Sequence, residues 1–356
     1  MKYLRLILLP FSAVYGLAVW FRNRLYDWGI LPSRSFDLPI VSVGNLEVGG
    51  SGKTPLTEYL VLLLAKFQVA TLSRGYGRKT KGFRWVKQND DSTLSGDEPL
   101  QIKNKFPDIA VAVCEDRVAG VEQLQTNHHV IVLDDAYQHR AIKPGFNILV
   151  FNYHHLKRPR FLLPAGNYRD WFRERKRADL LLISKCPDNL SLSERETIVR
   201  KMQPFIHQKV VFSAIRYADN LSHIVSKENK SIYTVNQETS VLLITGIANP
   251  VPLIKEIQKY TQKITHHFYP DHHLFSTKNM LKLVGEFDSL AGENKIIITT
   301  EKDAVRLNIR ENQKHIYSLP VYQWPIEIAF LDNDQSVFDQ EILNYVISNQ
   351  RSVSIH

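Results

Sequence analysis

A glycine-rich loop offers the clearest chemistry in the chain, because residues 44–57 read GNLEVGGSGKTPLT. When such a P-loop joins a strand to a helix, its backbone N–H groups surround phosphate oxygens and the helix start adds a positive dipole end. Lys53 would then reach the β- and γ-phosphates of a nucleoside triphosphate, and Thr54 would hold Mg²⁺. The strict pattern has glycine where this chain has Glu47, so a turn that binds nothing is the alternative. We expect the nucleotide to contact Gly49, Gly50, Ser51, Gly52, Lys53 and Thr54.

Two acids end an apolar run further along the chain, in the sequence VIVLDD at residues 130–135. Ligands bind outside the carboxyl ends of strands in open α/β sheets, and an acid at such a strand end holds Mg²⁺ in P-loop proteins. Asp134 is the expected metal ligand, directly or through water, and Asp135 is the second candidate. A turn or a helix cap is the alternative for both.

Two other polar segments contain groups that could handle a proton. They are SGDEP at residues 95–99 and PDHH at residues 270–273. A histidine beside a carboxylate can accept the proton of an alcohol that attacks phosphorus. Spacing alone does not decide the role of either segment, because Asp97 could equally be a helix N-cap and His272 could equally be a surface histidine. Arg117, in CEDR, could contact a phosphate or simply pair with an acid.

Lysine and arginine outnumber aspartate and glutamate by 45 to 36, and the net charge of +9 suits an acidic partner. The excess is concentrated at residues 71–87 and 155–177. We expect these clusters to bind anions near the other motifs rather than nucleic acid, and a solvated face is the alternative. The two cysteines, Cys114 and Cys186, form neither a disulfide framework nor a metal pattern.

The N-terminal segment indicates a membrane surface. Residues 6–21 are almost wholly apolar, with Arg5 before them and Arg22 and Arg24 after them. The segment is shorter than the about 20 residues that span a bilayer, and no convincing signal-peptide cleavage site follows it. The basic and aromatic flanks favour a helix that lies in the interface of one leaflet, and a core helix is the alternative.

Short runs of Val, Ile and Leu alternate with helical stretches and define the expected fold. The runs are dense, as in strands buried on both faces of a parallel sheet. We predict an α/β fold with a P-loop NTPase-like parallel sheet flanked by helices, a smaller second α/β domain and an N-terminal membrane-associated helix. The expected divisions are residues 1–28, 29–215 and 216–356, with residues 216–236 as a connector. Strands are expected at 39–43, 69–73, 109–113, 130–134, 146–151, 179–184, 210–215, 241–245, 263–268 and 295–300, and helices at 54–67, 116–126, 191–203, 251–262 and 276–289.

Taken together, the motifs resemble those of the tetraacyldisaccharide 4′-kinase family, the membrane-bound lipid A kinases of Gram-negative bacteria. The matching segments lie in the family's order between about residues 39 and 307. They read VGNLEVGGSGKTP, LSRGYGRK, SGDEP, CEDR, LDDAYQHR, LLPAGNYRD, PDHH and TEKDAVRL.

This resemblance implies a reaction and its participants. ATP, with Mg²⁺, would phosphorylate the 4′-hydroxyl of an acylated glucosamine disaccharide 1-phosphate and give lipid IVA, a step of lipid A biosynthesis. The enzyme would work at the cytoplasmic face of the bacterial inner membrane, as a peripheral or monotopic protein, without an obligate protein partner. The resemblance also implies roles for particular residues: Asp97, His272, Asp135 and His139 in catalysis, Arg117, Gln138 and Arg169 at the nucleotide, and Thr54, Asp134 and Asp170 at the metal.

The chain departs from the family's usual residues in two places. Ala136 and Tyr137 stand where the family commonly has Gly and Phe, and an alanine is restricted if the glycine used a positive φ. Asp170 stands where the family usually has Glu, and its shorter side chain makes a water-mediated metal contact the expectation.

A membrane-associated P-loop NTPase switch is the alternative from another functional class. Such a switch would hydrolyse nucleotide without an acceptor. A guanine-reading version would carry an Asn-Lys-x-Asp segment, and the nearest segment here, Thr-Glu-Lys-Asp at 300–303, lacks the asparagine. A binding module without catalysis would show no ATP turnover at all.

Overall fold

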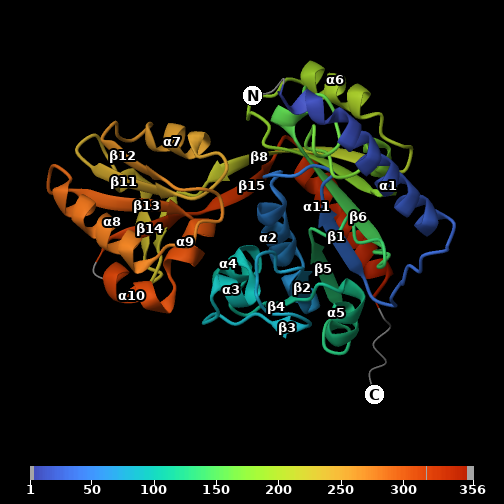
Figure 1. Ribbon diagram of the computed structural model, residues 1–356, viewed down its shortest axis with the longest axis horizontal. Coiled ribbons are helices and arrows are strands. Elements are labelled where there is room, and N and C mark those ends of the chain that lie inside the picture. Colours follow the sequence, from blue (N-terminus) through green and yellow to red (C-terminus); the bar gives the residue numbers. More distant parts are fainter. Residues whose placement is uncertain (1–3, 318, 351–356) are drawn as a thin grey trace.

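The computed structural model describes residues 4–317 and 319–350, and these form two lobes with one sheet each (Figure 1). We call the nine-stranded sheet with its helices the first lobe, and the six-stranded sheet with its helices the second lobe. The predicted α/β fold, with a mostly parallel main sheet and a smaller second sheet, is confirmed. The strands β8 and β15 lead from the first sheet to the second lobe (Figure 1).

The first sheet is parallel except at its two edges. Its inner strands pair in parallel, and the edge strands β3 and β15 pair antiparallel to their neighbours. Val, Ile and Leu fill the inner strands because helices cover both faces. In spatial order the strands are β15 (Ile326–Phe330), β8 (Lys209–Tyr217), β7 (Leu180–Ser184), β6 (Phe146–Asn152), β1 (Ile40–Gly44), β5 (Val130–Asp134), β2 (Val69–Ser73), β4 (Ala110–Val113) and β3 (Arg84–Trp85).

Helices cover both faces of the first sheet. On one face α2 (Lys53–Leu63) and α11 (Asp334–Ser348) bury leucine, isoleucine and phenylalanine side chains against β1, β5 and β6. On the other face lie α5 (Arg117–Leu124) and α6 (Leu192–Met202). The remaining helices of this lobe are α3 (Ser92–Ser95), α4 (Asp97–Lys105) and the 3₁₀ turns η2 (Ala65–Phe67), η3 (Tyr153–His155) and η4 (Phe172–Arg177).

The second lobe repeats this design on a smaller scale. Four neighbouring strands, which include the edge strand β12, pair in parallel, and β9 and β10 on the other side of the sheet pair antiparallel. One face is covered by α7 and the other by α8, α9 and α10. The strands are β10 (Asn229–Ser231), β9 (Asn220–His223), β14 (Val321–Trp324), β13 (Lys295–Thr300), β11 (Ser240–Thr245) and β12 (Ile264–Phe268), and the helices are η5 (Ile232–Thr234), α7 (Val251–Ile257), α8 (Thr277–Ser289), α9 (Glu301–Leu307) and α10 (Arg310–Ile316).

Two parts of the chain lie differently from the sequence expectation. Residues 216–236, expected as a connector, contribute the short polar strands β9 and β10 to the second sheet. Residues 326–348 return to the first lobe as β15 and α11, because β15 adds an edge to β8 and α11 packs beside α2. The division into units 1–28, 29–215 and 216–356 stays a prediction, because sheet membership alone does not define a folding unit.

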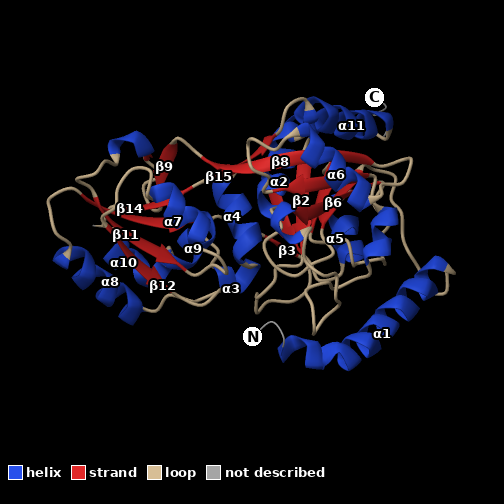
Figure 2. Cartoon of the chain, turned by 90° about the horizontal axis from the view of Figure 1, so that it is seen from above, coloured by secondary structure: helices blue, strands red, loops and turns tan. Residues whose placement is uncertain are grey.

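The N-terminal segment forms the turn η1 (Leu4–Leu8) and the helix α1 (Leu9–Asp27), which lies along the outside of the first lobe (Figure 2). Its length and apolar composition would suffice to cross a membrane. The buried face of α1 is polar or small: Ser12 Oγ donates to the Leu162 carbonyl (3.0 Å), and Trp171 Nε1 donates to the Gly16 carbonyl (2.9 Å). Its large apolar side chains, such as Phe11, point outward.

Candidate active site

The glycine-rich loop joins β1 to α2 at the carboxyl edge of the first sheet, as the sequence predicted. Gly49 and Gly52 have φ angles of 106° and 92°, in the left-handed region that favours glycine. A Cβ atom on Gly52 would lie only 3.1 Å from Ser184 Oγ of β7. Lys53 is the first residue of α2, and the loop therefore delivers both its lysine and a helix N-terminus to one point.

Other segments hold the loop in place. Val48 N donates to the carbonyl of Asn167 (2.8 Å), so the start of the loop is tied to the segment LLPAGNYRD. Asn152 Nδ2, at the end of β6, donates to the Gly50 carbonyl (3.3 Å). Ser51 is buried, and its hydroxyl accepts a hydrogen bond from Asn45 Nδ2 (3.0 Å). A braced loop keeps its backbone donors oriented before a ligand arrives, which lowers the cost of binding.

Two cations meet Asp135 just after β5. Lys53 Nζ lies 3.8 Å from Asp135 Oδ1, and Arg169 Nη1 donates to Asp135 Oδ2 (3.1 Å). Burial opposes ionisation of Asp135, but the charges of Lys53 and Arg169 lower its pKa. The positive φ of this turn falls on Asp135 (49°), and Ala136, which stands in place of a glycine of the resembled family, therefore carries no such strain.

Asp134 is the last residue of β5 and is almost fully buried. Its Oδ1 accepts a hydrogen bond from Thr57 Oγ1 of α2 (3.3 Å). Burial and the neighbouring charges of Glu98 and Asp135 raise the pKa of Asp134 to about 7, although Lys53 opposes this. A buried carboxylate among other carboxylates is short of positive charge, and this is the environment that a divalent cation relieves.

The chemistry of these oxygen donors suits Mg²⁺. Thr54, in the first turn of α2, and Asp134 would supply a hydroxyl and a carboxylate oxygen. Within residues 4–317 and 319–350, no three His, Cys, Asp or Glu side chains gather closely enough to hold a metal ion. Mg²⁺ usually takes one or two carboxylates together with substrate phosphates and water, and this donor set therefore fits a nucleotide-bound Mg²⁺.

Asp170 contacts the N-terminal helix. Its Oδ1 accepts hydrogen bonds from Asn23 Nδ2 of α1 (2.9 Å) and from Trp171 N (2.8 Å). Its Oδ2 lies 3.8 Å from Arg177 Nη2. Burial raises the pKa of Asp170. These contacts connect α1 to the segment that braces the loop, and the predicted metal role of Asp170 stays a prediction.

Arg117, Gln138 and His139 surround the same strand ends. Arg117 Nε and His139 Nε2 are buried and have no hydrogen-bond partner in the described part of the chain. Burial lowers the pKa of both groups, and the charge of Arg117 lowers that of His139 further. Gln138 Nε2 donates to the Asn45 carbonyl (2.7 Å) and so braces the loop. Unpaired buried donors near a phosphate-binding loop are available to a ligand.

Asp97 and His272 form a pair that joins the two lobes. Asp97 is the first residue of α4, and His272 lies in the loop after β12 with a φ of 63°. His272 Nδ1 lies 3.0 Å from Asp97 Oδ2, and Lys302 Nζ lies 3.3 Å from His272 Nε2. Arg306 also donates to Asp97 Oδ2 (Nε, 2.9 Å). Burial opposes the effect, but the hydrogen bonds from His272 and Arg306, with their surrounding charge, lower the pKa of Asp97 to about 2.

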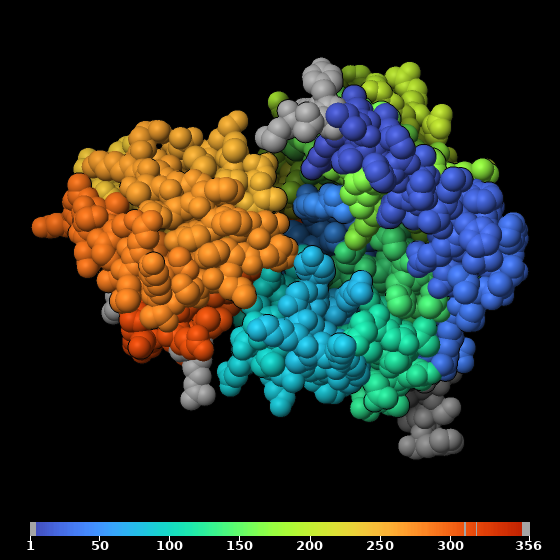
Figure 3. Space-filling view, viewed as in Figure 1, coloured from blue at the N-terminus to red at the C-terminus, as the bar shows by residue number. Residues whose placement is uncertain are grey.

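The space-filling view shows a hollow beside the elements that carry these groups (Figure 3). A recess lies between the orange second lobe, the cyan segment that contains α4, and the dark blue helix α1, and blue atoms from the region of α2 are visible at its floor (Figure 3). The P-loop helix and the segment that carries Asp97 therefore border one opening.

The chain matches a known protein family over almost its whole length. The family model described as tetraacyldisaccharide-1-P 4′-kinase matches residues 4–346. The chain belongs to the tetraacyldisaccharide 4′-kinase family. Its activity is that of a tetraacyldisaccharide 4′-kinase, an enzyme of lipid A biosynthesis, as the sequence motifs predicted.

Individual relatives agree with the family assignment. The chain is 41% identical over 351 residues to the tetraacyldisaccharide 4′-kinase of Phocaeicola vulgatus, with 97% of this chain and 96% of the relative covered. It is also 41% identical over 353 residues to that of Flavobacterium johnsoniae, with 98% and 99% covered. A crystal structure of LpxK from Aquifex aeolicus in complex with ATP matches with a TM-score of 0.75 and 29% identity, over 96% of this chain and 99% of that one.

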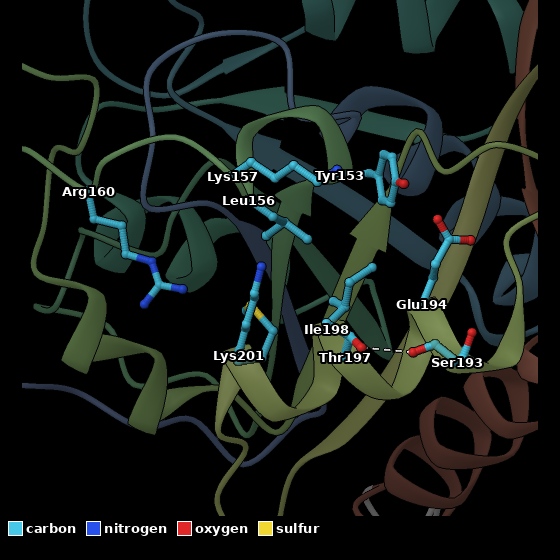
Figure 4. A pocket seen from close by; sticks show the side chains of 10 residues that line it. Tyr153, Leu156, Lys157, Arg160, Ser193, Glu194, Thr197, Ile198 and Lys201 are labelled. Carbon is cyan, nitrogen blue, oxygen red and sulfur yellow. Dashed lines mark hydrogen bonds between the residues drawn. The ribbon is translucent and has the colours of Figure 1, made fainter.

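A further cavity in this kinase lies away from the predicted residues. It has a volume of about 370 Å³ and lies between α6 and the segment after β6 (Figure 4). Its lining includes the apolar side chains of Leu156 and Ile198, the ring of Tyr153, and the basic side chains of Lys157 and Lys201. None of the predicted catalytic, nucleotide or metal residues lines this cavity, so it is separate from the kinase site.

Several residues of the candidate site were not predicted from the sequence. Asn45 contacts both Arg169 and Gln138, and Glu98 acts on Asp134 through its charge. Lys302 and Arg306 flank the Asp97–His272 pair. The only available signal was that these residues stand inside the resembled motifs VGNLEVGGSGKTP, SGDEP and TEKDAVRL, because contacts between motifs far apart in sequence leave no local pattern.

Proposed function

We propose that the P-loop residues Gly49 to Thr54 bind the phosphates of ATP, and that the Asp97–His272 pair receives the 4′-hydroxyl of tetraacyldisaccharide 1-phosphate. The observation that carries this proposal is the hydrogen bond between Asp97 and His272, at 3.0 Å, in the family whose activity is phosphoryl transfer to an alcohol. The two side chains come from different lobes, so the acceptor site would exist only where the lobes meet.

The geometry suggests different tasks for the two members of the pair. Asp97 has a low pKa, so it is a weak proton acceptor but stays ionised as a hydrogen-bond acceptor. By accepting Nδ1–H from His272 it would leave Nε2 of the imidazole to take the hydroxyl proton. The 4′-oxygen then forms a bond to the γ-phosphorus of ATP while the bond from that phosphorus to the bridging oxygen of ADP breaks, and the proton ends on His272.

Cations on the first lobe would neutralise charge during the transfer. Lys53 and Arg169 already face Asp135, and the buried Nε of Arg117 has no hydrogen-bond partner among residues 4–317 and 319–350. Mg²⁺, when bound by Thr54, Asp134 and phosphate oxygens, would supply further charge neutralisation. Gln138 would hold the loop in place through its hydrogen bond to the Asn45 carbonyl. The neutral His139 would donate or accept a single hydrogen bond near the phosphates. Asp170 would act on the metal through water or through the segment that it holds.

The N-terminal helix supports work at a membrane surface. α1 turns its small and polar side chains toward the first lobe, and its large apolar side chains Phe11, Val14 and Leu17 are each more than half exposed. Hydrogen bonds made by Ser12 near the start of the helix and by Asn23 near its end hold it against the first lobe along most of its length. A helix held in this way would lie in the interface, with its apolar face in the lipid, rather than cross the bilayer. We infer that the kinase sits on the cytoplasmic face of the inner membrane, where ATP is present, without nucleic acid or an obligate protein partner.

The decisive experiment measures transfer and hydrolysis together. The full chain is incubated in detergent with γ-labelled ATP, Mg²⁺ and tetraacyldisaccharide 1-phosphate, and label is followed in lipid and in free phosphate. We expect label in the lipid, and little free phosphate when the lipid is omitted. Hydrolysis that does not depend on the lipid would support the nucleotide switch instead.

A further inference from the structure

Arg306 is a fully buried charged side chain near the candidate site, with a side-chain exposure of 0%. It comes from α9 in the second lobe and reaches Asp97 at the start of α4. Its Nε and Nη2 lie 2.9 and 2.5 Å from Asp97 Oδ2, and its Nη2 lies 3.1 Å from His272 Nδ1. The guanidinium therefore contacts both members of the proposed pair without facing solvent.

The other side of the guanidinium is fixed within the second lobe. Arg306 Nη1 donates to Asp303 Oδ1 and to the Gly246 carbonyl, both at 3.0 Å. Asp303 is itself held by Gly246 N (2.9 Å) and Thr300 Oγ1 (2.8 Å). A planar fork of five donors can serve two carboxylates at once, whereas the single ammonium of lysine cannot reproduce this geometry.

The helices that carry these residues also meet at a second point. α4 and α9 pack together between the lobes (Figure 1), and at the end of α4 Lys105 binds Glu58 of α2 (2.7 Å) and Glu301 of α9 (2.9 Å). These salt bridges connect α9 to α4 and α2 without the Arg306 side chain. As a result, loss of the Arg306 side chain would release Asp97 without separating the helices.

The contacts that His272 and Arg306 make with Asp97 all reach the same oxygen of its carboxylate. His272 and Arg306 both approach Oδ2, and no donor in the described part of the chain bonds to Oδ1. With Oδ2 held from two sides, rotation of the Asp97 carboxylate is restricted.

We propose that Arg306 is a positioning residue of the kinase reaction, which fixes the rotamer of Asp97 and thereby aligns His272 when the lobes are docked. This rests on the proposed roles of Asp97 and His272. It explains why a charged side chain is buried at the interface of two lobes, where a pair of apolar residues would stabilise the contact equally well.

The test compares Arg306→Gln and Arg306→Lys with Asp97→Asn and with the double variant Asp97→Asn/Arg306→Gln. We expect Arg306→Gln to lower kcat by about 100-fold, because misplaced reacting groups cost about this much, while the KM for ATP and the KM for the lipid change by less than about threefold. Arg306→Lys should restore only part of kcat. The double variant should be no slower than Asp97→Asn, since the proposed positioning by Arg306 requires the Asp97 carboxylate.

A matched control separates positioning from stability. Arg195 of α6 also binds two carboxylates, Asp332 and Asp334, but away from Asp97. Arg195→Gln should lower the melting temperature and leave kcat unchanged. If Arg306→Gln does not fold, the milder Arg306→Lys, measured on folded protein, decides instead. An unchanged kcat in the folded Arg306 variant, or losses that multiply in the double variant, would overturn this proposal. An unchanged kcat in Asp97→Asn would overturn the proposed function itself.

Discussion

Replacement of Asp97 by Asn gives the most direct stability test of the contact between the lobes. Asn keeps the shape of the side chain but removes its charge, and it leaves the buried Arg306 without one of its two carboxylates. Loss of one partner of a buried ion pair is strongly destabilising, because the other charge stays buried without compensation. We therefore expect Asp97→Asn to be less stable than the natural protein at neutral pH.

The magnitude follows from the pKa of Asp97. Its ordinary value of 3.8 falls to about 2 in the folded protein, and the Asp97 side chain is only 11% exposed, so solvent screening is small. This shift corresponds to about 2 kcal/mol of folding free energy, at about 1.4 kcal/mol per unit. Because the folded-state pKa is lowered, the contribution is fully present above about pH 4, is roughly halved by pH 3, and is lost as the pH falls through about 2.

The assay is urea unfolding in detergent, followed by tryptophan fluorescence, at neutral pH and near pH 3. The control is Asp271→Asn, because Asp271 also lies beside His272 and Lys302 but is 40% exposed and does not contact Arg306 in the described structure. We expect Asp97→Asn to lose about 2 kcal/mol at neutral pH and about half of that near pH 3, and Asp271→Asn to change little. Equal stability of Asp97→Asn and the natural protein at neutral pH would refute the ionised contact between the lobes.

Three further substitutions test the loop and the helix. Gly52→Ala forces a side chain onto a φ of 92° beside Ser184, so we expect a loss of about 1–2 kcal/mol in thermal or chemical unfolding and weaker ATP binding; wild-type affinity would show that the loop needs no glycine there. Lys53→Met removes the cation that faces Asp135, and calorimetry should show at least about a tenfold weaker affinity for ATP, whereas unchanged affinity would place the phosphates elsewhere. Leu17→Asp puts a charge on the outward face of α1, and flotation with anionic liposomes should show a smaller bound fraction; unchanged flotation would reject the interfacial helix.

The sequence predicted the central strands well because burial on both faces leaves a dense apolar run. Residues 130–134, 241–245 and 295–300 were placed within a residue of β5, β11 and β13. The short strand β3 and the polar strands β9 and β10 were not predicted, since a short strand at the side of a sheet is defined by its partners rather than by its own composition. β15 joins the first sheet only through its pairing with β8, a long-range contact that no local pattern records.

In the candidate site, too, some residues could be predicted from local patterns and others could not. Gly52, Lys53 and Asp134 were predicted from local motifs, because a phosphate loop and an acidic strand end have their own sequence patterns. The contact between Asp97 and His272 spans 175 positions and came from the family resemblance, since a histidine after a strand is uninformative by itself. Arg306 was part of a resembled motif but received no role, because its contact with Asp97 spans 209 positions and exists only after the lobes dock.

Above all, we propose that a histidine of the second lobe takes part in phosphoryl transfer from a nucleotide bound by the first lobe. Single-turnover transfer by His272→Asn, with ATP and tetraacyldisaccharide 1-phosphate both saturating, measures this step without product release. We predict at least about a hundredfold slower transfer at an unchanged dissociation constant for ATP. Transfer at the wild-type rate would contradict the account, as would a slower rate explained entirely by weaker ATP binding.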